Sequence, residues 1–311
     1  MRKSLLLVGV LIFGVGACSS SDSAPETTTA TTATATTARM TTTSGATTTG
    51  VATSIAPPPP VEPIRVAVIG DFGIGTTAEY EVAALIEAMA TDQAVHALVT
   101  TGDNFYNDDI DTIWFEPYGW VDEAGVTIYP AWGNHDIETQ DRVDLVYRNL
   151  RPAFWWYSTK LGEATLIVVD SNQVDSDEQL SWLEDTLAVS DGLVIVAFHH
   201  PAFACGTHGS TGSVIERWVP LFEEYGVDLV LNGHEHSFER FSVAGVTYIV
   251  TGGAGQALRP IGTCPVGTPG SLKSDAEHQH YVLLEIDDQT IEATTIAVGG
   301  TIIDRTVITD R

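Results

Sequence analysis

Five apolar, strand-like segments of this chain each end in a polar side chain that can bind a metal ion or a phosphate. They lead into Gly70-Asp71, Gly102-Asp103, Gly133-Asn134, Phe198-His199 and Gly233-His234. Short apolar runs bounded by turn residues are typical of strands buried in an α/β sheet, and open sheets of this class bind ligands at the carboxyl ends of their strands. The pattern therefore predicts an α/β fold in which these five side chains gather at one sheet edge.

Segments between these strands show the spacing of helices. Residues Glu79 to Met89, with Thr77 as a cap, place their apolar residues on one face, and Gln179 to Val189 and Val214 to Tyr225 do the same. The tail from Tyr281 to Ile308 instead alternates apolar and polar residues around paired turn residues. That alternation predicts antiparallel hairpins at the C-terminal end.

The second of the five segments carries a tyrosine, Tyr106, three residues after Asp103. A phenol has an unperturbed pKa of ~10, so it becomes an anionic ligand only beside a strong Lewis acid such as a trivalent metal. A carboxylate and a phenolate at this spacing suggest iron. Taken alone, Gly-Asp-Asn is more typical of an ordinary turn than of a metal site.

Histidines complete a candidate metal site. His199 follows a strand, and His234 and His236 lie two residues apart, so in extended chain both point the same way. Oxygen and imidazole ligands suit iron, zinc or manganese, and the lack of a cysteine in the set argues against a structural zinc site. Two metals ~3.5–4 Å apart are a recurrent device for phosphate ester hydrolysis. The residues therefore predict a two-metal hydrolase.

The first 62 residues differ in composition from the rest. Residues 1–18 combine a basic start with a short apolar run and predict an export signal, and Val15-Gly16-Ala17-Cys18 resembles a bacterial lipobox that would place a lipid on Cys18. An ordinary signal peptide is the alternative. Residues 19–62, rich in Thr, Ala and Pro, predict a disordered stalk, and residues 63–311 a catalytic domain. The predicted location is extracytoplasmic, either lipid-anchored to the bacterial cell membrane or secreted.

Charge and cysteine content restrict the partners. The formal net charge is -27, which excludes a nucleic-acid-binding surface and requires a local cationic centre for any anionic substrate. Besides Cys18, only Cys205 and Cys264 remain. In an oxidising compartment this pair can form a disulfide, with two free thiols as the alternative. The sequence does not define the oligomeric state.

The five segments resemble, in the same order, the five motifs of metallophosphoesterases, and those of the purple acid phosphatases in particular. The resemblance extends from Ile64 to the C-terminus, and Tyr106 is its diagnostic residue because many other metallophosphoesterases lack it. It implies a four-layer α/β/β/α sandwich of two mixed β-sheets flanked by helices. The segments that carry it are Gly70-Asp71-Phe72-Gly73, Gly102-Asp103-Asn104-Phe105-Tyr106, Gly133-Asn134-His135-Asp136, Val196-Ala197-Phe198-His199 and Gly233-His234-Glu235-His236.

The resemblance also implies a role for each site residue. His135 and His208 match the family's non-ligand histidines, which contact substrate phosphate and protonate the leaving group, although the loop around His208 matches only in part. His200 occupies a place where members of the family vary, so the resemblance assigns it no role. Asp103 would bridge an iron(III) ion and a divalent metal, which would be iron(II), zinc or manganese. The implied ligands are Asp71, Asp103, Tyr106 and His236 for iron(III), and Asp103, Asn134, His199 and His234 for the divalent metal.

These observations predict an exported dimetal acid phosphatase that hydrolyses phosphate monoesters by in-line attack of a metal-bound hydroxide. A phosphodiesterase or nucleotidase on the same dimetal core is one alternative. A non-catalytic surface binding protein that keeps the fold is the other. The sequence does not name the natural phosphoester.

Overall fold

The computed structural model describes residues 62–310. The predicted export signal, the lipid site at Cys18 and the predicted stalk lie outside the described residues, apart from Glu62, and remain predictions. Within residues 62–310, none of the helices combines the length and the apolar character needed to cross a membrane.

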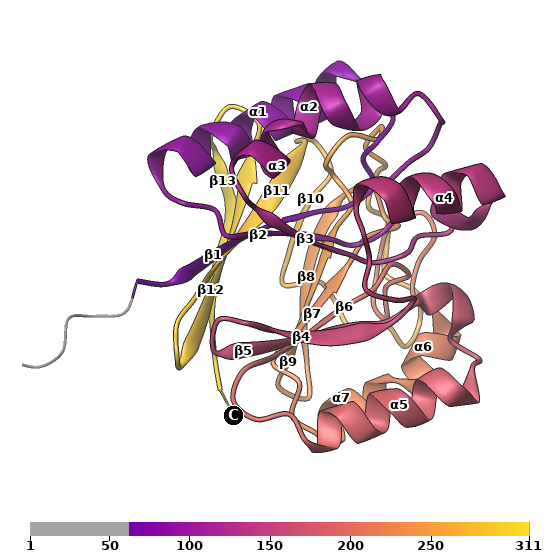
Figure 1. The fold of residues 1–311 in the computed structure, drawn as a ribbon. Helices are drawn as coiled ribbons and strands as arrows, with labels where there is room; N and C mark the ends of the chain where they lie inside the picture. Colours follow the sequence, from indigo (N-terminus) through magenta and orange to yellow (C-terminus); the bar gives the residue numbers. More distant parts are fainter. Residues whose placement is uncertain (1–61, 311) are drawn as a thin grey trace, which may run out of the picture. The chain divides into compact units, whose positions relative to one another are not determined.

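Two mixed β-sheets make up the middle layers of the described domain (Figure 1). The first has the strand order β13-β12-β11-β1-β2-β3, and the second has the order β10-β8-β9-β7-β6-β5-β4. The strands of the first sheet are β1 (Ile64–Ile69), β2 (Ala97–Thr100), β3 (Thr127–Pro130), β11 (His280–Ile286), β12 (Thr290–Ala297) and β13 (Ile302–Thr309). Those of the second are β4 (Tyr157–Leu161), β5 (Ala164–Val168), β6 (Val194–Ala197), β7 (Leu229–Asn232), β8 (Phe238–Val243), β9 (Val246–Thr251) and β10 (Lys273–Asp275).

Strand direction in the sheets follows the sequence patterns. The strands that precede the polar segments are parallel to their neighbours: β1, β2 and β3 in the first sheet, and β5, β6 and β7 in the second. The tail forms the antiparallel strands β11, β12 and β13, which confirms the predicted hairpins. Parallel neighbours place their carboxyl ends at the same edge, and this is the edge where the polar segments begin.

Both faces of the inner strands are buried. In β1, Val66 and Val68 point toward the second sheet and share an apolar cluster with Leu166 of β5. Ala67 and Ile69 point the other way, into a cluster with helical residues. Because side chains alternate between the faces of a strand, a strand covered on both sides must be apolar throughout. That is why these strands appear in the sequence as continuous apolar runs.

Helices cover the outer face of each sheet (Figure 1), which confirms the predicted four-layer α/β/β/α sandwich. The first sheet is covered by α1 (Thr77–Asp92), a π-helical turn (Asp111–Phe115), α2 (Glu116–Tyr118), α3 (Trp120–Glu123) and α4 (Gln140–Asn149). The second is covered by α5 (Asp177–Ala188), α6 (Gly212–Arg217) and α7 (Val219–Glu224).

Two of the predicted helices need correction. The hydroxyl of Thr76, one residue before the expected cap, accepts the Glu79 N–H at 3.3 Å and starts α1. The helix expected from Val214 to Tyr225 is two helices, α6 and α7. Pro220 explains the break, because proline has no N–H to donate to the carbonyl four residues earlier and its ring crowds that carbonyl.

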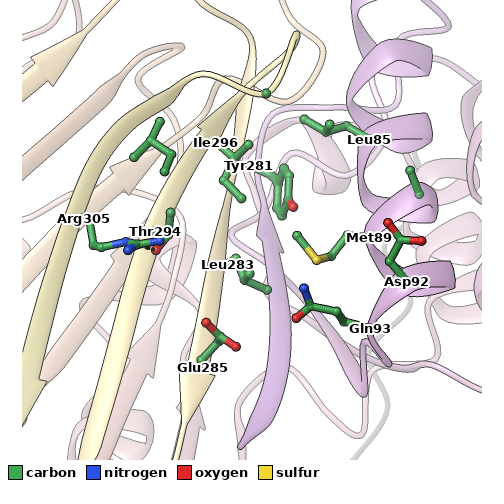
Figure 2. Close-up of a pocket in the computed structure, with 13 residues that line it drawn as sticks. Leu85, Met89, Asp92, Gln93, Tyr281, Leu283, Glu285, Thr294, Ile296 and Arg305 are labelled. Carbon is green, nitrogen blue, oxygen red and sulfur yellow. Dashed lines mark hydrogen bonds between the residues drawn. The ribbon is translucent and has the colours of Figure 1, made fainter.

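One cavity lies away from the polar segments, where α1 meets β11, β12 and β13. It encloses about 430 Å³. In Figure 2, Met89 of α1 lies opposite Tyr281 and Leu283 of β11. None of the predicted metal ligands lines this cavity, so the chemistry of the predicted site has to be sought elsewhere.

A disulfide joins Cys205, in the loop after β6, to Cys264, in the segment between β9 and β10. The two residues are 59 positions apart in the sequence. Closing a loop of this length restricts the unfolded chain by roughly 4 kcal/mol in the loop-entropy account. The bond also fastens together two segments that lie beside the predicted site.

Candidate metal centre

The predicted ligands come from the carboxyl ends of strands in both sheets. In the first sheet, β1, β2 and β3 lead into Asp71, Asp103 and Asn134. In the second sheet, β6 and β7 lead into His199 and His234. The expectation of a single sheet edge was therefore wrong. The two sheets stack with these edges together, so residues far apart in the sequence meet between them.

Strained backbone marks three of these positions. Asp71, Asp103 and His234 have φ angles of 57°, 50° and 70°, in the left-handed region that residues with a side chain seldom adopt. Such conformations persist where the surrounding structure enforces them, and they cluster at functional sites. Here each one turns a side chain sharply at the end of a strand and toward the common centre.

Two glycines allow the segments to approach this closely. Gly102 has a φ of +88°, and a Cβ there would lie 2.8 Å from the His199 Nδ1. A Cβ on Gly133 would lie 2.0 Å from the Asp103 backbone nitrogen. Any larger residue at either position would push the ligand segments apart.

The first set of converging donor atoms comprises the carboxylates of Asp71 and Asp103, the phenol of Tyr106 and an imidazole nitrogen of His236. The Tyr106 hydroxyl lies 3.2 Å from Asp71 Oδ1, 3.0 Å from Asp103 Oδ2 and 3.4 Å from His236 Nε2. His236 Nε2 is 3.4 Å from Asp71 Oδ1. These are the four residues predicted to surround iron(III).

The second set shares Asp103 Oδ2 with the first. His199 Nε2 lies 3.3 Å from that oxygen, 3.1 Å from Asn134 Oδ1 and 3.1 Å from His234 Nδ1. These are the four residues predicted around the divalent metal. All seven predicted ligands are therefore brought together in two adjoining sets, with Asp103 common to both.

Backbone carbonyls fix the orientation of two of the histidines. His199 Nδ1 donates to the Thr101 carbonyl at 2.9 Å, and His236 Nδ1 donates to the Ala257 carbonyl at 3.0 Å. In the neutral form of each ring, Nε2 is then left with a lone pair that points into the centre. Metal-binding histidines are typically held in this way, with the second ring nitrogen bonded to a carbonyl or carboxylate.

The acid–base properties of the centre also point to a cation. Burial alone would lower the pKa of His199, yet the Asp103 carboxylate beside it raises that pKa to about 9. Burial would raise the pKa of Asp103, yet His199 holds it well below its usual range. Burial and the carboxylates of Asp71 and Asp103 raise the pKa of Tyr106 well above its usual value. A phenolate at Tyr106 therefore requires a cation beside it.

The donor atoms fit two metal ions. In the neutral form of the ring, the lone pair of His199 Nε2 faces the oxygens of Asn134 and Asp103, which are both hydrogen-bond acceptors. Acceptors that crowd together without donors between them need a proton or a cation to hold them there. The mixture of carboxylate, amide, phenol and imidazole donors suits iron, zinc or manganese.

His135 lies over the centre without belonging to either donor set. Its backbone N–H donates to Asp103 Oδ1 at 2.8 Å, and its ring centroid is 4.5 Å from that of Tyr106. The ring Nδ1 is held at 2.6 Å by Glu138 Oε1, and Nε2 lies 4.0 Å from Asp103 Oδ2, on the side of the donor sets. Glu138 was not identified from the sequence, because its contact with His135 forms only when the segment between them makes a helical turn.

His208 lies over His234, a residue of the second donor set. The two rings stack with centroids 4.2 Å apart. The buried carboxylate of Glu235 accepts hydrogen bonds from the backbone N–H groups of His208 and Gly209. Burial lowers the pKa of His208, the Glu235 carboxylate opposes this shift and Arg259 adds to it. Glu235, between two histidine ligands, therefore positions the loop that carries His208.

Asp136 is the last residue of the segment Gly133-Asn134-His135-Asp136, and the sequence alone assigns it no role. It is fully buried, and its carboxylate accepts the N–H groups of Asn104, Phe105 and Gly133 at 2.8 to 3.1 Å. Burial raises its pKa to about 7. It ties the loop after β2 to the loop after β3 and so supports Asp103 and Asn134. An acidic residue that follows a ligand motif is the only signal of this role in the sequence.

His200 received no role in the sequence analysis, and the structure places it beside the second donor set. Its ring nitrogens, with those of His199 and His234, form one of the groups able to hold a metal ion. Its Nδ1 lies 2.8 Å from the Ser171 hydroxyl, and burial lowers its pKa to about 3. His200 is therefore a neutral side chain at the edge of the centre.

Comparison with known proteins identifies the segment that carries the centre. The family model for calcineurin-like phosphoesterases matches residues 64–238, which include all seven converging ligands. Purple acid phosphatase 4 of Arabidopsis thaliana is 24% identical over 283 residues, covering 78% of this chain and 83% of that protein. Several other matched relatives are longer, and the chain spans only 20% to 35% of their length.

Solved structures share the fold at low sequence identity. The purple acid phosphatase PPD1 from yellow lupin (Lupinus luteus) seeds superposes with a TM-score of 0.64 at 18% identity, covering 78% of this chain and 53% of that one. GAP50, the anchor in the inner membrane complex of Plasmodium, superposes with a TM-score of 0.68 at 16% identity, covering 81% and 90%. Likeness at these identities shows the fold alone.

Proposed function

Because the chain belongs to the calcineurin-like phosphoesterase family, we propose that it is a dimetal acid phosphatase that hydrolyses phosphate monoesters. The observation that carries the proposal is the convergence of seven ligand side chains from two sheets, with Asp103 Oδ2 shared by both donor sets. The first set, with Tyr106, would hold iron(III). The second would hold iron(II), zinc or manganese.

Metal ions bound here would supply Lewis acidity and lower the pKa of a water molecule. The chain's own residues then divide the remaining work. Asp103 fixes the spacing of the two donor sets, and His135 Nε2 faces the position of the substrate phosphate. His208, held by Glu235, would give a ring proton to the leaving-group oxygen as its bond to phosphorus breaks.

A substrate panel tests this proposal. The metal-loaded protein should hydrolyse phenyl phosphate and sugar phosphates faster than bis-phenyl phosphate or cyclic nucleotides, and should do so best at acidic pH. A clear preference for diesters would favour the phosphodiesterase alternative. If neither class is hydrolysed by protein that carries both metals, the fold serves binding, and the enzymatic proposal fails.

Replacing Tyr106 by phenylalanine should remove the colour of the iron-loaded protein. A phenolate bound to iron(III) gives a charge-transfer band in the visible range, and the Tyr106 hydroxyl is the phenol among the four atoms of the first set. Tyr106→Phe should bleach the band while iron stays bound through the remaining three ligands, as read by metal analysis. Wild-type protein with stoichiometric iron(III) but no colour would contradict the assignment of Tyr106.

We propose further that the protein works outside the cytoplasm. The predicted export signal in residues 1–18 and the lipobox-like sequence at Cys18 support this. The Cys205–Cys264 disulfide is consistent with it, because such bonds persist mainly in oxidising compartments. The lipid on Cys18 would then hold the catalytic domain at the cell membrane.

A further inference from the structure

An unpaired arginine lies beside the metal centre of this strongly acidic chain. Four of the 14 lysines and arginines lie outside the described residues. Of the other ten, only Arg259 and Lys273 have no carboxylate within ion-pairing distance in residues 62–310. The other eight, which do pair with carboxylates, are Arg65, Arg142, Arg148, Arg151, Lys160, Arg217, Arg240 and Arg305.

The guanidinium of Arg259 points at the site. Its Nη1 lies 2.6 Å from His208 Nε2, and the ring of His208 stacks on that of His234 in the second donor set. One imidazole ring therefore separates the guanidinium from a metal ligand. The guanidinium is therefore farther from the two donor sets than an ester phosphate bound at the metals would be.

The backbone holds Arg259 in this place. Its N–H donates to the carbonyl of His236 at 2.9 Å, and the N–H of Gln256 donates to the carbonyl of Asp71 at 2.9 Å. Further along the same segment, the N–H of Gly262 donates to the carbonyl of Cys205 at 2.9 Å, next to the disulfide. The segment is thus attached to two metal ligands and to the start of the loop that carries His208.

The contact that Arg259 makes with His208 is to a ring nitrogen and not to an anionic oxygen, so it is a poor match for a guanidinium. The planar fork of arginine matches the oxygens of a carboxylate or a phosphate, and charge-assisted hydrogen bonds to such anions are about twice as strong as neutral ones. No acidic side chain of the described domain takes that place at Arg259. The site is therefore arranged to receive an anion from outside the protein.

We propose that Arg259 forms a second anion subsite, which selects phosphoesters that carry a further anionic group next to the phosphate attacked, as in a diphosphate. This inference rests on the proposed phosphatase function. For a nucleoside diphosphate, the oxygen of water bonds to the terminal phosphorus and the bond from that phosphorus to the bridging oxygen breaks. The products are a nucleoside monophosphate and inorganic phosphate, and the proton released by water is taken up by the products or the solvent.

ADP and AMP are a matched pair of test substrates because they differ by one phosphate. Arg259→Gln should lower kcat/KM of the metal-loaded protein for ADP by about ten- to a hundredfold, the value of a charge-assisted hydrogen bond, and should lower that for AMP by a clearly smaller factor. Arg259→Lys should fall between, because lysine keeps the charge but not the fork. Lys273→Gln is the control, since it removes the same charge from an exposed cation that also lacks a carboxylate partner.

Comparing ADP with AMP also shows whether Arg259 acts only by positioning His208. AMP has an alkoxide leaving group that needs protonation more than the phosphate leaving group of ADP does. If Arg259 only positions His208, Arg259→Gln should impair AMP more than ADP, the reverse of the expected order. That result, or equal losses on both nucleotides, would overturn the subsite.

A binding measurement separates this inference from the function on which it rests. Calorimetry should show that wild-type metal-loaded protein binds methylenediphosphonate more tightly than methylphosphonate, and that Arg259→Gln removes most of this difference. If the protein hydrolyses no phosphoester but the difference is present, the phosphatase proposal fails and the subsite stands. If it hydrolyses monoesters but shows no Arg259-dependent difference, the subsite is refuted and the phosphatase proposal stands.

Discussion

Asp103→Asn should empty both metal sites and lower phosphatase activity by at least about a thousandfold. The Oδ1 atom of Asp103 accepts the His135 N–H, while Oδ2 faces both donor sets. An asparagine would keep its oxygen on that N–H and turn its NH₂ group, which cannot ligate a metal, toward the centre. Metal ions contribute several kcal/mol of transition-state stabilisation, and each 1.36 kcal/mol is worth tenfold in rate.

Two control variants make the result specific. Asp170→Asn changes another buried aspartate, one that caps a short turn and belongs to neither donor set, so it should keep both metals. His199→Ala should mainly empty the divalent site, because His199 belongs to the second set only. Metal analysis and circular dichroism of the three variants provide the readout. Two full equivalents of metal in folded Asp103→Asn would rule out the bridge.

His208→Ala should produce a defect that depends on the leaving group. An alkoxide needs a proton in the transition state far more than an activated phenolate does, and a positioned proton donor is typically worth ~10²–10⁴-fold. The variant should therefore lose that factor on sugar phosphates and much less on nitrophenyl phosphate. Steady-state kinetics on both substrates, with metal content measured in parallel, checks the expectation.

A structural role for His208 would give another result. If His208 only packs its loop or only contacts phosphate, both substrates should suffer by a similar factor. Equal losses would then move the proton donation to His135, whose Nδ1 is held by Glu138 and whose Nε2 lies 4.0 Å from Asp103 Oδ2. His135→Ala, measured on the same two substrates, would decide between the two histidines.

The ligands could be found in the sequence because each one directly follows a buried strand. An apolar run ends at a fixed place, so Asp71, Asp103 and His199 are identified by position as well as by residue type. The alternation of apolar and polar residues in the tail also predicted its antiparallel hairpins. The order of strands in the two sheets is not encoded locally, and it is this order that brings the edges of both sheets together around Asp103.

The supporting residues could not be found in the same way. Glu235 acts on the backbone of a loop 26 to 27 residues away, and Arg259 reaches a histidine 51 residues away. Neither contact leaves a spacing pattern, because each depends on how loops fold over the finished sandwich. The break between α6 and α7 was different in kind. Pro220 indicates the break in the sequence, but the helical spacing of apolar residues continues across it and predicts one helix.

The most direct test of a dimetal phosphatase is to count the metals and ask whether activity depends on them. Purified protein should contain two metal ions per chain, at least one of them iron, and should hydrolyse phenyl phosphate. Chelation should abolish turnover while the fold is retained, and adding iron with zinc or manganese should restore it. A folded chain that hydrolyses phosphomonoesters at full rate after both metals have been removed would contradict the account.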